Sequence, residues 1–157
     1  MALADELLTL LNAVDADFSP ALSSRLALAE YAAKLAANAT IFWVSDSGQP
    51  LAFAGFYAND PSRELAYLSM MAVAPDQRQT GLGSQLLNSG IAYLRRRGFQ
   101  RLRLEVYSSN TPAIALYRGL GFQLTRTSES AMFMELDLLG LPPAARHDVA
   151  DCGAGFV

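Results

Sequence analysis

The stretch LSMMAVAPDQRQTGLGSQLLNSGIAYLRRRG (residues 68–98) joins an apolar segment to an amphipathic one through a glycine-rich turn. Residues 65–74 have the apolar and aromatic composition of a strand, and residues 83–97 repeat apolar side chains at helical spacing. The first N–H groups of a helix have no partner within it, and the helix dipole favours an anion there. The turn RQTGLG, at residues 78–83, is therefore predicted to bind a phosphate group.

Two common phosphate-binding motifs do not fit this turn. A Walker loop requires a lysine followed by serine or threonine, and that lysine is missing. A dinucleotide fingerprint beginning at Gly81 would need a glycine where Leu86 stands, and no acidic residue follows about 20 residues later at a strand end. The remaining interpretation is a pyrophosphate held by the N–H groups of residues 79–84, with Arg78 adding positive charge.

The segments around this turn predict a single α+β domain, because the 157 residues suit one compact unit. Three strands separated by turn residues should form an antiparallel meander, and the strand after the central helix should pair in parallel with the strand before it. The predicted fold is a mixed, mostly antiparallel central sheet flanked by helices. The expected helices cover residues 2–13, 20–37, 83–97 and about 111–120, and the expected strands cover 41–45, 51–58, 65–74, 101–107, 122–129 and 130–138.

Composition argues against several classes of function. The net charge of −3 is not that of a general nucleic-acid binder, and no apolar run reaches the roughly 18 residues of a membrane span. The N-terminal segment resembles an amphipathic helix more than a signal peptide, so a cytoplasmic location is expected. The single histidine, His147, and the single cysteine, Cys152, argue against a metal site and a Ser-His-Asp triad. A homodimer is left open.

Two blocks of the sequence resemble the GNAT superfamily of N-acetyltransferases. VAPDQRQTGLGSQLL (residues 73–87) is similar to its acetyl-CoA motif, in which [Q/R]-x-x-G-x-[G/A] opens a helix after an apolar strand. LEVYSSNTPAIALYRGLGF (residues 104–122) resembles its N-x-x-A-x-x-L-Y-x-x-x-G-F block. Both occur in the right order and cover roughly residues 65–122. The resemblance implies a GNAT-like acetyltransferase domain over residues 1–140, followed by a tail or docking arm over residues 141–157.

The resemblance also implies acetyl-CoA as co-substrate, no metal, and direct attack of a primary amine on the thioester in a ternary complex. Asn110 matches the asparagine that hydrogen-bonds the pantetheine arm, and Tyr117 matches the general acid that serves the departing thiolate. The other residues that the resemblance assigns to cofactor binding are Met71, Ala72 and Val73 along the pantetheine arm, and Arg78, Gln79, Thr80, Gly81, Leu82, Gly83 and Ser84 at the pyrophosphate.

Glu105 is the candidate general base. It alternates with the apolar residues of RLRLEVY (residues 101–107) and so should lie on the opposite face of that strand. Its segment is similar to bacterial ribosomal-protein-alanine N-acetyltransferases, whose glutamate at this position is assigned as the base. A structural role, paired with Arg101, Arg103 or Arg118, is an equally weighted alternative. A substrate amine that arrives already neutral would need no base.

The acceptor is left open among a small amine, an amino sugar and a peptide N-terminus. In the family it is normally read by the first helices, the strand turns and the final hairpin. Asp60, one of the candidate acceptor residues, is better explained by its position in the turn YANDPSR. A non-catalytic module that binds acyl-CoA is the competing hypothesis, and Tyr117 and Asn110 argue against it. The candidate acceptor residues are Tyr31, Trp43, Tyr57, Asn59, Asp60, Ser69 and Glu129.

Overall fold

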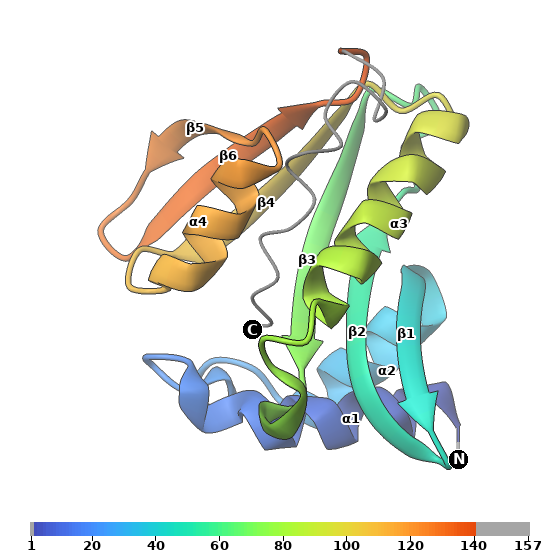
Figure 1. The fold of residues 1–157 in the computed structure, drawn as a ribbon, viewed down its shortest axis with the longest axis vertical. Coiled ribbons are helices and arrows are strands. Elements are labelled where there is room, and N and C mark those ends of the chain that lie inside the picture. The colour runs from blue at the N-terminus through green and yellow to red at the C-terminus, as the bar shows by residue number, and fades with distance from the viewer. Residues whose placement is uncertain (1, 141–157) are drawn as a thin grey trace.

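The computed structural model describes residues 2–140, which form one six-stranded sheet with helices on both faces (Figure 1). The α-helices are α1 (Leu3–Val14), α2 (Leu28–Asn38), α3 (Leu82–Arg96) and α4 (Thr111–Gly119), and short 3-10 turns are η1 (Asp15–Asp17), η2 (Leu22–Ser24) and η3 (Pro75–Gln77). The strands are β1 (Thr40–Asp46), β2 (Gln49–Tyr57), β3 (Leu65–Val73), β4 (Arg101–Tyr107), β5 (Gln123–Thr127) and β6 (Ala131–Asp137). The predicted tail, residues 141–157, lies outside the described residues.

The sheet order β1-β2-β3-β4-β6-β5 confirms the predicted α+β class. β1, β2 and β3 form the antiparallel meander, and α3 connects β3 to the parallel strand β4. β6 and β5 extend the other side of the sheet as an antiparallel pair. No helix within residues 2–140 is long and apolar enough to cross a membrane.

The predicted helix over residues 20–37 is wrong in its first half. Only a 3-10 turn, η2, forms there, and α2 begins eight residues later than predicted, at Leu28. The carboxylate of Asp15 accepts hydrogen bonds from the backbone N–H of Ser23, at 2.7 Å, and from its hydroxyl, at 2.6 Å. Such local side-chain bonds give the backbone an alternative to the helical ladder. The segment between α1 and α2 is therefore free to approach the sheet as a loop.

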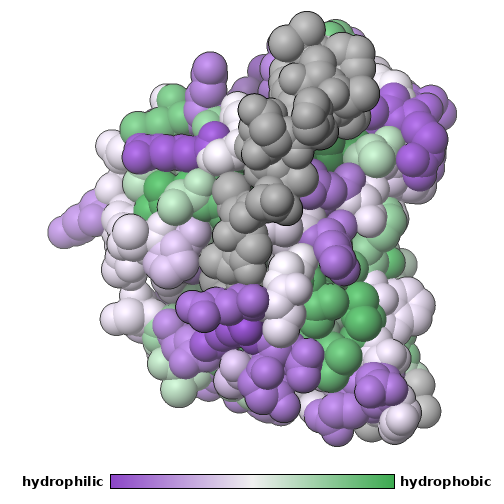
Figure 2. All heavy atoms as spheres, in the orientation of Figure 1, coloured by the Kyte–Doolittle hydropathy of each residue, from purple (hydrophilic) through white to green (hydrophobic). Residues whose placement is uncertain are grey.

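Two hydrophobic cores lie on opposite faces of the sheet. α1 and α2 pack against one face, around Phe53 and Ala72, and α3 and α4 pack against the other face. α3 approaches the sheet closely at Gly90, where a Cβ atom would lie 2.2 Å from a ring atom of Phe56. Hydrophilic residues gather where the loop before α3 lies over α1 in the space-filling view (Figure 2).

β3 and β4 pair along only half of their length. Their register runs from Leu65 with Arg101 to Leu68 with Leu104, although β3 continues to Val73 and β4 to Tyr107. β3 also has one extra residue at this point, because Gly55 pairs with Met70 and Phe56 with Leu68. Such a bulge bends a strand locally. The two strands diverge beyond it, so the sheet is split between them (Figure 1).

Candidate active site

The loop before α3 contains two residues in left-handed conformations and leads into the N-terminus of that helix. Gln79 and Gly81 have left-handed φ angles of 62° and 88°, and Gly81 occupies the N-cap position of α3. Within the described chain no side chain caps this helix, so its first-turn N–H groups are left for a ligand. The hydroxyl of Ser84, in the first turn of α3, is buried and has no hydrogen-bond partner among residues 2–140. This end of α3 is therefore suited to an anion.

Arg78 of this loop pairs with an acidic residue from a distant part of the chain. Its guanidinium donates to the carboxylate of Asp17 in η1 at 2.6 Å, so its charge is neutralised by a residue 61 positions earlier. The pair ties the loop to the segment that follows α1. Thr80 also serves the loop itself, because its hydroxyl donates to the carbonyl of Gln77. The Nε atom of Arg78 is buried and has no hydrogen-bond partner among residues 2–140.

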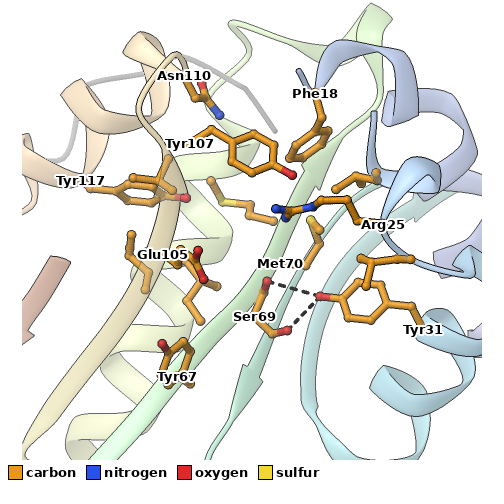
Figure 3. A pocket seen from close by; sticks show the side chains of 16 residues that line it. Phe18, Arg25, Tyr31, Tyr67, Ser69, Met70, Glu105, Tyr107, Asn110 and Tyr117 are labelled. Atoms are coloured by element: carbon orange, nitrogen blue, oxygen red, sulfur yellow. Dashed lines mark hydrogen bonds between the residues drawn. The ribbon is translucent and has the colours of Figure 1, made fainter. Parts of the chain in front are cut away.

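A cavity of about 290 Å³ occupies the split between β3 and β4 (Figure 3). It extends through the sheet, because its lining comes from both faces. Leu104 and Val106 belong to the core under α3 and α4, so the alternating residues Glu105 and Tyr107 lie toward α1 and α2. The sixteen lining residues are Phe18, Leu22, Arg25, Leu26, Tyr31, Tyr67, Leu68, Ser69, Met70, Met71, Leu104, Glu105, Val106, Tyr107, Asn110 and Tyr117.

The predicted pantetheine residues form the diverging end of β3. Met71, Ala72 and Val73 are buried, and their backbone pairs with β2 on one side. On the other side the pairing with β4 has already ended at Leu68. The β4-facing edge of this segment therefore borders the split, where an extended chain could pair with it as an added strand.

Tyr117 and Asn110 enter the cavity from α4 and its N-terminus. Tyr117 is 5% exposed, and its ring contacts Phe122 at a centroid distance of 5.6 Å. Burial raises the pKa of the Tyr117 hydroxyl, so it stays protonated and can donate a hydrogen bond at neutral pH. Asn110 accepts a hydrogen bond from the N–H of Ala113 at 3.3 Å and so caps α4. The side chain of Asn110 also lines the cavity.

Glu105 is exposed in the cavity rather than paired with an arginine. Arg103 and Arg101 instead approach Glu135 on the neighbouring strand β6, at 2.6 and 3.6 Å. Among residues 2–140 no ion pair or hydrogen bond involves Glu105. The ion pairs that would have given it a structural role are therefore not formed in this part of the chain.

Of the predicted acceptor residues, Tyr31 and Ser69 line the cavity. Their hydroxyl oxygens are 2.8 Å apart, and the Tyr31 hydroxyl also donates to the Ser69 carbonyl at 3.3 Å (Figure 3). Asp60 accepts hydrogen bonds from its own turn, including both the N–H and the hydroxyl of Ser62, which confirms the turn interpretation. These bonds also lower the pKa of Asp60. The remaining predicted residues, Trp43, Tyr57, Asn59 and Glu129, do not line this cavity.

The segment between α1 and α2 contributes cavity residues that were not predicted from the sequence. Phe18 contacts the ring of Tyr107 edge-on at 5.7 Å, and the guanidinium of Arg25 lies over that ring at 4.9 Å. Leu22 and Leu26 complete this wall. The prediction placed most of this segment in a helix. The hydrogen bonds that Ser23 donates to Asp15 hold this segment as a loop.

The chain is similar to proteins that transfer acetyl groups. Over 65 residues it is 40% identical to mycothiol acetyltransferase of Saccharomonospora viridis, covering 41% of this chain and 21% of that protein. Over 81 residues it is 42% identical to the ribosomal protein bS18-alanine N-acetyltransferase of Escherichia coli K12, covering 52% of this chain and 53% of that protein. The chain thus spans about a fifth and about half of these two relatives' lengths.

A solved structure extends the similarity over most of the chain. The crystal structure of the ribosomal-protein-S18-alanine N-acetyltransferase from Escherichia coli superposes with a TM-score of 0.64 and 30% identity, covering 84% of this chain and 90% of that one. The model of the acetyltransferase (GNAT) family matches residues 7–122, which include the glycine-rich loop, the sheet split and α4. The chain therefore belongs to the acetyltransferase (GNAT) family.

Proposed function

We propose that this protein transfers an acetyl group from acetyl-CoA to a primary amine by direct attack in a ternary complex. The observation that carries the proposal is the cavity through the split sheet, adjacent to the diverging end of β3 and lined by Tyr117 and Glu105. Membership of the family supports it independently. The acetyltransferases named among its relatives support the same class of reaction.

In this proposal acetyl-CoA binds along the α3 side of the split. The pyrophosphate would accept hydrogen bonds from the N–H groups of residues 79–84, where the dipole of α3 adds positive potential. The pantetheine arm would pair with the backbone of Met71–Val73, whose β4-facing edge lies in the split. Asn110 would hydrogen-bond the same arm. The thioester would then reach the part of the cavity lined by Tyr117.

The acceptor amine would enter from the α1 and α2 side, where Glu105 lies. Its nitrogen attacks the thioester carbonyl, forming the C–N bond, and the C–S bond then breaks. Glu105, directly or through water, takes the proton that the nitrogen loses. Tyr117 donates a hydrogen bond to the sulfur as negative charge develops there. Because burial raises the pKa of Tyr117, donation to the thiolate is favoured over complete proton transfer.

An amine screen tests this function. The purified protein is mixed with acetyl-CoA and a panel of small amines, amino sugars and peptides with a free N-terminus, and the released thiol is measured. Amine-dependent thiol release with a matching acetylated product is expected. Tight acetyl-CoA binding by calorimetry without thiol release from any acceptor would favour the non-catalytic module. Binding of NAD in place of acetyl-CoA would contradict both. The domain limits, the cytoplasmic location and a homodimer stay predictions.

A further inference from the structure

Arg25 supplies a positive charge to the acceptor side of the cavity. It follows η2 directly, and its guanidinium carbon lies 4.9 Å from the centre of the Tyr107 ring. Its side chain extends into the space between Tyr107 and Met70 (Figure 3). Within residues 2–140 no carboxylate pairs with it. The stacking on Tyr107 holds the guanidinium in place while leaving its N–H donors for a ligand.

The charges of the cavity are one cation and one anion that do not pair with each other. Among its sixteen lining residues only Arg25 and Glu105 are charged at neutral pH. They come from opposite walls, Arg25 from the segment between α1 and α2, and Glu105 from β4 (Figure 3). The other side chains around Arg25, Phe18, Leu22 and Leu26, are apolar. Arg25 and Glu105 are both exposed, so solvent screens part of their attraction to a charged ligand group and the hydrogen-bond geometry must supply the selectivity.

Resting on the proposed function, we propose that the acceptor is a free amino acid, with an amine facing Glu105 and a carboxylate bound by Arg25. The planar guanidinium donates two parallel hydrogen bonds to a carboxylate, which fixes the orientation of the ligand as well as binding it. The apolar wall suits an acceptor with an apolar body. A polycationic acceptor is disfavoured, because its second positive charge would lie beside Arg25. An acceptor with a doubly charged phosphate is disfavoured, because a single arginine would face its two negative charges with Glu105 nearby.

Acceptor pairs matched in shape but different in charge test the proposal. Phenylalanine, leucine, methionine and ω-amino acids of increasing length are compared with their carboxamides, and β-alanine with aminoethyl phosphate. The measured quantity is kcat/KM from thiol release, in the wild type and in Arg25→Gln. Arg25→Gln should lower kcat/KM for the preferred carboxylate about 10- to 100-fold, as expected for losing charge-assisted hydrogen bonds. The same substitution should change kcat/KM for the matched amide less than about threefold. The acid-to-amide ratio of kcat/KM in the wild type, divided by that ratio in the variant, then isolates the carboxylate contact.

Two further variants separate recognition from stability. Arg25→Lys keeps the charge and should retain part of the carboxylate preference. Arg126→Gln is the matched control, because Arg126 also lies over an aromatic ring, that of Phe133 at 3.9 Å, but lies on β5 outside the cavity lining. It should leave the acid-to-amide ratio unchanged. Thermal unfolding of each variant checks that the fold is intact.

The outcomes distinguish this proposal from the function on which it rests. Absence of thiol release with every amine refutes the acetyltransferase function, and the acceptor class falls with it. Acetylation of amines with equal kcat/KM for acids and amides, or an acid preference that survives Arg25→Gln, refutes the amino-acid acceptor alone. Weaker acetyl-CoA binding in Arg25→Gln would instead assign Arg25 to the cofactor. Preference for peptide N-termini or for the aminoethyl phosphate would likewise overturn the proposal.

Discussion

Tyr117→Phe removes one hydroxyl from the centre of the proposed reaction and leaves the rest of the side chain in place. The ring of Tyr117 is buried between α4 and the sheet and contacts Phe122. A phenylalanine ring fills the same volume, so the core around α4 should not collapse or overpack. The variant therefore reports the hydroxyl more than the packing, provided that thermal unfolding gives a similar melting temperature.

The expected loss follows from what the hydroxyl would do. A hydrogen bond to a charged group contributes about 1.5–3 kcal/mol, and the charge on sulfur develops only as the C–S bond breaks. The turnover number should accordingly fall about 10- to 150-fold, while the acetyl-CoA dissociation constant changes less than about threefold. Burial raises the pKa of Tyr117 above its ordinary value, so the hydroxyl keeps its proton from pH 7 to pH 9. The ratio of wild-type to variant turnover should therefore stay constant across that range.

Initial rates with a thiol readout, at saturating amine and varied acetyl-CoA, separate the two quantities, and calorimetry gives the dissociation constant directly. Equal turnover in wild type and variant would refute the role of Tyr117 in thiolate departure. A ratio that falls steadily with rising pH would mean that the hydroxyl titrates in the assay range, which contradicts its burial. A large loss of acetyl-CoA affinity with unchanged turnover would make Tyr117 a binding residue only.

Three other substitutions address the base, the loop and the core. Glu105→Gln should lower the turnover number at pH 7, and part of the loss should be recovered at high pH, where the amine loses its own proton. A ratio of wild-type to variant turnover that does not change with pH would make Glu105 structural. Gly81→Val should weaken acetyl-CoA binding by at least about tenfold in calorimetry, because valine disfavours the φ angle of 88° at this position. Gly48→Val is the control, because Gly48 in the β1–β2 turn has a similar φ angle of 80°. The Gly48→Val protein should bind acetyl-CoA normally. Gly90→Ala should lower the free energy of unfolding by about 1–3 kcal/mol in denaturant titrations, because the added Cβ meets the Phe56 ring and this clash exceeds the gain in helix propensity. An unchanged denaturation midpoint would show that the ring can move aside.

The parts of the fold that follow a local pattern were predicted closely. RLRLEVY alternates strictly, and β4 covers the same residues 101–107. The glycine-rich turn and Pro112 likewise lie where α3 and α4 begin. Contacts between distant segments could not be predicted in this way. The pairing of Arg78 with Asp17, for example, joins residues 61 positions apart.

The same distinction explains why the donor was easier to infer than the acceptor. The loop and the diverging end of β3 belong to one continuous stretch, residues 68–84, so their spacing in the sequence fixes their spacing in the fold. The proposed acceptor side combines Arg25, which precedes α2, with Glu105 on β4, and only the folded chain brings these two residues to one cavity. A substitution at position 25 would thus alter the acceptor side, whereas Asp17 in the same segment pairs with Arg78 of the loop before α3. We expect chains with this loop but different residues at position 25 to bind acetyl-CoA alike and to differ in the charge of the amines they acetylate.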